Sequence, residues 1–485
     1  MSTVAFKEHS VPLAGLAVAG ALLAVACYAY LRLGAYIDHI EGAVVVSAWE
    51  YAASGIPLYQ LRDGLPRLAT YYGPLAYLAE ALPLAAFGAK IVVGKLASML
   101  AVAATLFILG KHFLTRGGSA ASSGLFYLVA GMTLFVPVSF WVRPDPFETL
   151  LVAAGVALAA TPAALGLCIG LAVNFKIHAF VYFFPLLIDI LVARQWRSFL
   201  LIAAAASISF ALPFLAPGIS LYDYLSGLLS QIGGRHPSGT EIASVLVTAL
   251  VLALPLLYPL LTQAQVGRDR TYALAAIVTL LVLIYPATFP GAGPYHFLPL
   301  IPVLADALSR LKPRAWVAGI TTLPLLLLGF LATLSVSHGM AARRGWDLIA
   351  ADALALARQA PTRAVQIGYG ETSRSYHIAE FSRAVLTLNG FPARVDAQVL
   401  MELSPIGIDG SRRWVAALTR CDIQRWLLPK GQKPFALRNL FYGLGPVFDA
   451  DFRRTFLNHY RLTASDRYFD IWDCAVPNKE PSAAN

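Results

Sequence analysis

Charged residues are scarce in this chain: they make up 13% of its 485 residues, while 58% are hydrophobic. Soluble globular domains carry about 25% charged residues, so this composition excludes an ordinary soluble protein. Cysteine is also rare, and the four cysteines are too few and too scattered for a zinc cluster. A complete dinucleotide-binding fingerprint is missing as well, because residues 368–370 (Gly-Tyr-Gly) match only a fragment of it.

Long apolar runs, in contrast, recur from Val11 to Ser337, each long enough to cross about 30 Å of hydrocarbon. After Ser337, arginine, aspartate, tyrosine and tryptophan become frequent, and no further run of this length follows. We therefore predict a polytopic α-helical membrane domain of about eleven spans in residues 1–340. Residues 341–485 are predicted to form a soluble exported α/β domain, and residues 32–90 the first exported loop.

Many basic residues, which give the chain a net charge of +10, lie in short loops between the apolar runs. Lysine and arginine are enriched in the cytoplasmic loops of membrane proteins, so this charge indicates topology and we expect no nucleic-acid partner. The same rule predicts a cytoplasmic N-terminus and a periplasmic or extracellular C-terminal domain. Because the chain is compact and shows no endoplasmic-reticulum retrieval signal, we expect it in a bacterial inner membrane. Residues 147–175 form either one long span or, as the loop charges favour, two short spans joined at Thr161-Pro162.

Two carboxylates, Asp38 and Glu41, follow the first span three positions apart. Charged groups at a membrane are costly to bury and are often functional. Such carboxylates can take a proton from a hydroxyl or hold a divalent cation with a phosphate. The structural alternative is a helix N-terminus, which attracts acidic residues. The predicted topology brings six further polar residues to the same face of the membrane: Arg67, Arg143, Asp145, Lys176, His178 and His296.

Three segments of the first loop resemble the first exported loop of GT-C glycosyltransferases: residues 38–41 (Asp-His-Ile-Glu), 55–59 (Gly-Ile-Pro-Leu-Tyr) and 71–75 (Tyr-Tyr-Gly-Pro-Leu). The group that is most similar includes the protein O-mannosyltransferases and the lipid A aminoarabinose transferase. This chain departs from it at Gly73, where a proline is common. Three later segments also resemble family features: residues 143–145 (Arg-Pro-Asp), 174–176 (Asn-Phe-Lys) and 295–299 (Tyr-His-Phe-Leu-Pro).

The resemblance implies transfer of one sugar from a polyprenyl-phosphate donor to a glycan or glycolipid acceptor at the outer face, with inversion at the anomeric carbon. Asp38 would be the general base, and Glu41 or Asp145 would orient the acceptor or tune Asp38. A lipid phosphate leaves readily when fixed cations stabilise its charge. The candidates for that role are Lys176, His178, His296, Arg67 and Arg143.

Other interpretations stay open at this point. Lys176 can be a lysine that snorkels to the interface, Arg143 can simply pair with Asp145, and the two histidines can be ordinary interfacial residues. An oligosaccharide ligase or polymerase with a lipid-diphosphate donor is one alternative function, because residues 217–241 form a long loop. A transporter is another, although the chain has no evident internal repeat. The need for a divalent cation is not decided by the sequence.

The C-terminal region has an α/β pattern. Strands are predicted at residues 363–368, 426–428 and 468–472, and a helix at residues 376–388, ending at Asn389-Gly390. Cys421 and Cys474 both fall in this exported domain, where a disulfide can persist. We therefore expect these two cysteines to pair.

Overall fold

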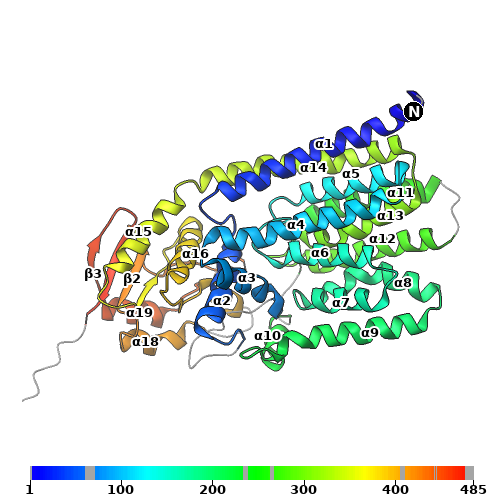
Figure 1. Cartoon of the computed structure of the whole chain (residues 1–485). Helices are drawn as coiled ribbons and strands as arrows, with labels where there is room; N and C mark the ends of the chain where they lie inside the picture. Colours follow the sequence, from blue (N-terminus) through cyan, green and yellow to red (C-terminus); the bar gives the residue numbers. More distant parts are fainter. Residues whose placement is uncertain are drawn as a thin grey trace, which may run out of the picture.

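The computed structural model describes residues 3–59, 72–232, 237, 239–262, 267–404, 410–441, 443 and 445–475. It consists of a helical bundle and a C-terminal α/β domain (Figure 1). The N-terminus of α1 and the C-terminal domain lie at opposite ends of the bundle (Figure 1). This arrangement agrees with the predicted opposite sidedness of the two ends, although which end faces the cytoplasm stays a prediction.

The bundle is built from helices whose apolar faces meet in one continuous core. Helix α1 runs beside α14 and also packs on α5 (Figure 1). Six helices of the described part of the chain are long and apolar enough to cross a membrane, and shorter apolar helices lie among them. The predicted polytopic helical class is therefore confirmed, while the number of spans stays a prediction. The helices of the bundle are α1 (Thr3–Arg32), α4 (Ile91–Leu114), α5 (Gly118–Leu134), α6 (Pro144–Ala157), α7 (Pro162–Val173), α8 (Phe184–Val192), α9 (Trp196–Ala211), α11 (Gly239–Thr262), α12 (Arg268–Ala287), α13 (Ile301–Leu311) and α14 (Ala315–Ala342). Helix α10 (Leu221–Ile232) contributes none of its described side chains to this core, and its Tyr224 packs in the hydrophobic cluster of α2 and α3.

Residues 147–175 form two helices rather than one. Helix α6 ends at Ala157, α7 begins at Pro162, and the two pack against each other. Proline lacks a backbone N–H and fixes its φ angle, so it is favoured in the first turn of a helix and disfavoured in the interior. The hairpin returns the chain to the end of the bundle where α6 began. Lys176 therefore lies beside Asp145, as described below.

A layer of helices separates the bundle from the C-terminal domain. It consists of α2 (His39–Ser54) and α3 (Pro74–Phe87), with α2 packing on both α3 and α16 (Ser373–Leu388) (Figure 1). Tyr36 and Phe381 meet edge to face across this layer, with ring centroids 6.0 Å apart. The backbone N–H of Ala393 donates to the buried Glu50 carboxylate at 2.8 Å. The C-terminal domain is thus anchored on the layer that carries the first loop.

The C-terminal domain contains a four-stranded sheet in the order β1-β2-β4-β3. Strands β1 (Val365–Ile367) and β2 (Arg425–Pro429) are parallel, whereas β3 (Tyr460–Ser465) and β4 (Phe469–Cys474) pair antiparallel. The three predicted strands and the predicted helix α16 are present, and β3 was not predicted. The remaining helices are α15 (Trp346–Arg358), α17 (Ala397–Leu403), α18 (Val415–Thr419) and α19 (Ala450–His459).

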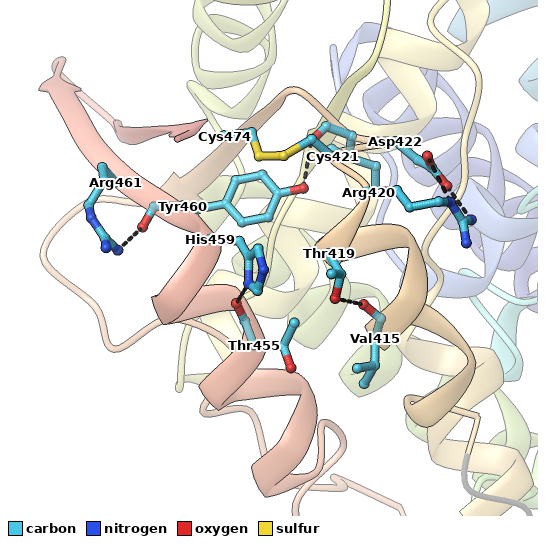
Figure 2. The surroundings of a disulfide bond; sticks show 11 residues. Val415, Thr419, Arg420, Cys421, Asp422, Thr455, His459, Tyr460, Arg461 and Cys474 are labelled. Atoms are coloured by element: carbon cyan, nitrogen blue, oxygen red, sulfur yellow. Dashed lines mark hydrogen bonds and ion pairs between the residues drawn. A yellow bond between two sulfur atoms is a disulfide. The ribbon is translucent and has the colours of Figure 1, made fainter. Parts of the chain in front are cut away.

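A disulfide joins Cys421 to Cys474, as predicted (Figure 2). It connects the turn before β2 to the end of β4, across a sequence separation of 53 residues. The Tyr460 hydroxyl donates to the carbonyl of Ile423 at 2.6 Å beside it. The disulfide therefore ties β4 to the turn that leads into β2, its neighbour in the sheet.

Candidate functional site

A cavity of about 610 Å³ lies where the bundle, the first loop and the C-terminal domain meet. Its floor comes from the bundle, through α14 and the two short 3₁₀ helices Ile177–Phe183 and Pro294–Leu300. One wall comes from the start of α2 and another from the C-terminal domain. Five of the predicted site residues line the cavity: Asp38, Arg143, Lys176, His178 and His296.

Asp38 is the N-cap of α2, and its side chain accepts a hydrogen bond from the backbone N–H of His39 at 2.8 Å. Nδ1 of His39 lies 2.6 Å from the same carboxylate oxygen, Oδ1, and Nη1 of Arg143 lies 3.1 Å from Oδ2. Burial on its own raises the pKa of Asp38, but His39 and Arg143 outweigh it and hold that pKa well below its ordinary value. The Asp38 carboxylate is therefore ionised at neutral pH.

Glu41 is fully buried and turns away from the cavity, whose lining among the described residues does not include it. Its carboxylate accepts hydrogen bonds from the backbone N–H groups of Ile37 at 2.7 Å, Asp38 at 2.8 Å and Val142 at 3.2 Å, and from the Tyr30 hydroxyl. With Asp38 it completes a capping box at the start of α2. Glu41 thus joins the Asp38 loop to the loop that carries Arg143.

Lys95 supports the same loop and was not predicted. Its buried ammonium donates to three backbone carbonyls at the end of α1 and beyond it: Tyr30 at 2.9 Å, Leu33 at 2.6 Å and Ala35 at 2.7 Å. The carbonyl of Tyr30 also accepts from the N–H of Leu33 at 3.2 Å, while Leu33 and Ala35 lie beyond the last residue of α1. The ammonium thus supplies hydrogen-bond donors where the helix ends, a place where C=O groups lose their regular helical partners. A lysine inside an apolar helix is itself a signal of function or of a specific partner, and this signal could have identified Lys95.

Arg143 lies at the centre of the site and is 7% exposed. In addition to Asp38, its guanidinium contacts the hydroxyl of Tyr295 at 3.4 Å and stacks over Trp141, 4.4 Å from the ring centroid. Nε of Arg143 lies 3.7 Å from Asp145. Planar stacking and several donors favour arginine over lysine at such a position. The guanidinium is therefore fixed at the edge of the cavity, between two carboxylates.

Lys176 and Asp145 form a buried ion pair, with Nζ of Lys176 2.5 Å from Oδ1 of Asp145. Nζ is also 3.5 Å from Oε2 of Glu148, one turn further along α6. Both carboxylates are fully buried and are absent from the described cavity lining, whereas Lys176 lines the cavity. The structure therefore places Asp145 behind Lys176. The partner Glu148 was not predicted, although its spacing of three from Asp145 on one helix face was a signal.

His178 and His296 lie side by side on the cavity floor, with ring centroids 5.2 Å apart. The hydroxyl of Tyr182 donates to the carbonyl of His296 at 2.9 Å and lies 3.5 Å from Nε2 of His178. Tyr295 stacks on His296 at 4.9 Å between ring centroids. These rings form an aromatic floor next to the two cations.

Arg67 and Tyr71 lie outside the residues that the structure describes. Within the described ranges, no three histidine, cysteine, aspartate or glutamate side chains are grouped so as to hold a metal ion. The structure therefore assigns no metal ligands there. Three further cavity residues come from the C-terminal domain and were not predicted: Gln398, Glu402 and Phe441.

No family model and no curated protein matches this sequence. Two solved structures are similar to it. The structure of ArnT from Cupriavidus metallidurans bound to undecaprenyl phosphate has a TM-score of 0.60 at 13% identity, covering 94% of this chain and 98% of that chain. The apo structure of the same protein has a TM-score of 0.60 at 12% identity, covering 94% and 97%. The GT-C fold expected from the resemblance is therefore confirmed, over the bundle and the C-terminal domain together.

Proposed function

We propose that this protein is a membrane glycosyltransferase that moves a single sugar from a polyprenyl-phosphate donor to a glycan or glycolipid acceptor at the exported face, with inversion. One observation carries the proposal. An ionised carboxylate, Asp38, and two fixed cations, Arg143 and Lys176, line the same cavity. The similarity to the structure of ArnT bound to undecaprenyl phosphate supports the choice of donor.

The two cations are suited to a phosphate leaving group. When the bond between the anomeric carbon and the phosphate oxygen breaks, negative charge develops on the departing lipid phosphate. Arg143 and Lys176 stabilise this charge in a partly enclosed site, where such interactions are stronger than in water. Asp145 and Glu148 hold Lys176 in place from behind. His178 and His296 border the same region and can donate hydrogen bonds to phosphate oxygens.

Asp38 is suited to accept the proton of the acceptor hydroxyl. The acceptor oxygen attacks the anomeric carbon from the face opposite the phosphate, and its proton passes to the carboxylate. His39, 2.6 Å away, and the Arg143 guanidinium, 3.1 Å away, together make Asp38 a weak base. A donor phosphate that engages Arg143 withdraws the arginine's share of this counter-charge and so raises the pKa of Asp38 toward a value better suited to a general base. Donor binding in this way makes Asp38 a stronger base for the acceptor proton.

The ligase alternative depended on residues 217–241, of which Arg235 and His236 lie outside the described residues. No contact of the described residues favours a ligase or a transporter, so neither is proposed here.

The test is donor turnover in nanodiscs with a panel of polyprenyl-phosphate sugars, followed by mass spectrometry of lipids and acceptors. We expect sugar transfer or release by the wild type and a fall of about 10²–10⁴-fold in Asp38→Asn, the usual contribution of a positioned base. Asp451→Asn, an exposed position of the C-terminal domain, is the matched control and should keep full activity. Unchanged turnover in Asp38→Asn would refute the assignment of the base. Failure of the wild type to bind or use any lipid-phosphate donor would refute the function.

A further inference from the structure

The cavity wall contributed by the C-terminal domain is polar on one side and aromatic on the other. Gln398 and Glu402 come from one face of α17, and the Gln398 amide donates to the Glu402 carboxylate at 3.1 Å. Gln398 is 4% exposed, yet its Oε1 has no hydrogen-bond partner among the described residues. Leaving a buried amide oxygen without a partner is unfavourable, so this oxygen is suited to accept a hydrogen bond from a molecule bound in the cavity.

Phe441 forms the aromatic side of this wall. It stacks on His39 with ring centroids 5.1 Å apart, and His39 contacts the proposed base Asp38. Phe441 also lines the cavity. The aromatic surface is therefore one residue away from the carboxylate that would receive the acceptor proton.

This wall is held rigidly. Asn439 is 2% exposed; its amide donates to the carbonyl of Met401 in α17 at 2.8 Å, and its side-chain oxygen accepts from the N–H of Phe441 at 3.0 Å. Asp396 caps α17 by accepting from the backbone N–H groups of Gln398 and Val399. The polar and aromatic sides are thus fixed relative to each other before any ligand binds.

The wall is also tied to the layer that carries Asp38. Asp396 pairs with Arg383 at 2.9 Å, and Arg383 pairs with Glu380 at 2.5 Å. Arg383 and Glu380 lie on α16, which packs on α2. A preorganised set of side chains held in this way is what specific recognition needs.

Charge separates this wall from the phosphate region. The phosphate region holds the two cations, whereas the wall carries a carboxylate and an amide. A carboxylate repels a phosphorylated group and binds hydroxyls, and an aromatic ring packs against the apolar C–H face of a sugar. We propose that Gln398, Glu402 and Phe441 form the acceptor subsite, and that it takes a neutral, hydroxylated sugar ring rather than a phosphorylated one. This inference rests on the proposed function.

The test uses the full-length protein in nanodiscs free of sugar detergents. The probes are octyl glycosides of neutral hexoses and the corresponding sugar phosphates. Saturation-transfer NMR measures glycoside binding without turnover, and the transfer assay gives the acceptor KM with the active donor. We expect Glu402→Gln and Phe441→Ala each to raise the acceptor KM about tenfold, with undecaprenyl-phosphate binding unchanged. Glu402→Lys should shift the preference toward the sugar phosphate.

Glu371→Gln, an exposed glutamate of the same domain, is the matched control and should leave the acceptor KM unchanged. An unchanged acceptor KM in both Glu402→Gln and Phe441→Ala, or preference of the wild type for the sugar phosphates, overturns the acceptor subsite while the glycosyltransferase function stands. Binding of undecaprenyl phosphate by the wild type without binding of any neutral glycoside also overturns it. Absence of both lipid-phosphate binding and transfer overturns the proposed function itself.

Discussion

Replacing Lys176 by methionine tests two roles of its ammonium, which are to compensate buried carboxylates and to bind the donor phosphate. The side chain is 6% exposed; its ammonium pairs with Asp145 at 2.5 Å and lies 3.5 Å from Glu148, and both carboxylates are fully buried. Removing one partner of a buried pair leaves an uncompensated charge and costs about 3–5 kcal/mol. Arg143 cannot take over, because its closest atom is 3.7 Å from Asp145 and it also serves Asp38. We therefore expect the free energy of unfolding of Lys176→Met to fall by about 3–5 kcal/mol.

The double variant Lys176→Met/Asp145→Asn removes the carboxylate along with the cation. It should recover part of the lost stability, because the carboxylate closest to the Lys176 ammonium is gone while Glu148 remains. It should not recover binding of undecaprenyl phosphate, because the proposed phosphate cation is still absent. Unfolding in nanodiscs and lipid-phosphate binding are measured on both variants, with the exposed Lys111→Met as control.

Two results would refute this reasoning. A single variant as stable as Lys111→Met would mean that the buried pair contributes little, and a double variant no more stable than the single one would mean that Asp145 is not the charge that Lys176 compensates. Wild-type affinity for the lipid phosphate in the double variant would remove Lys176 from the phosphate site. The stability and binding readouts are independent, so each role can fail alone.

Three further predictions concern the supports of the site. Glu41→Gln should lose about 1–3 kcal/mol of stability and most of the transfer activity. The reason is that an amide cannot accept hydrogen bonds from all the N–H groups that bond to the Glu41 carboxylate. Wild-type activity in this variant would show that the Asp38 loop is held by other contacts. Burial lowers the pKa of His377 to about 4, below an ordinary value of about 6.5. As the pH drops from about 6.5 to 4, the unfolded state takes up a proton before the folded state does, so the free energy of unfolding should fall by up to about 1.4 kcal/mol per pH unit. His377→Gln should flatten this slope in unfolding curves, and an identical slope would exclude His377 as its origin. Cys474→Ser should destabilise the C-terminal domain by about 4 kcal/mol, from the chain entropy of a 53-residue loop, and a limited-proteolysis pattern identical to that of the wild type would contradict this.

Local sequence patterns predicted the parts of the fold that depend on local physics. The proline at position 162 and the loop charges predicted the α6–α7 hairpin, and the hairpin put Lys176 at the same end as Asp145. The helix ending at Asn389-Gly390 was also visible, because Gly390 adopts a positive φ of 84° that favours glycine. Strand β3 was missed because five of its six residues are exposed, which leaves no apolar alternation to detect.

Long-range contacts were beyond the sequence. The bond from Val142 to Glu41 joins residues 101 positions apart, and nothing local indicates that Glu41 turns inward while Asp38 faces the cavity. Gln398, Glu402 and Phe441 gave no signal either, because polar and aromatic residues are common on the surface of a soluble domain. Long-range packing, such as that of α16 on α2, brings them to the cavity.

The cavity takes its residues from both ends of the chain, from Ile37 near the start to Phe441 near the finish. The ribosome synthesises the wall at the start of α2 early and the wall from the C-terminal domain late. The first loop and the cations are synthesised with the early helices, but the wall opposite them exists only after the C-terminal domain has been synthesised and folded. A nascent or truncated chain that ends at the last helix of the bundle therefore has an open, incomplete cavity. Maturation of the site is in this way coupled to completion of the whole protein.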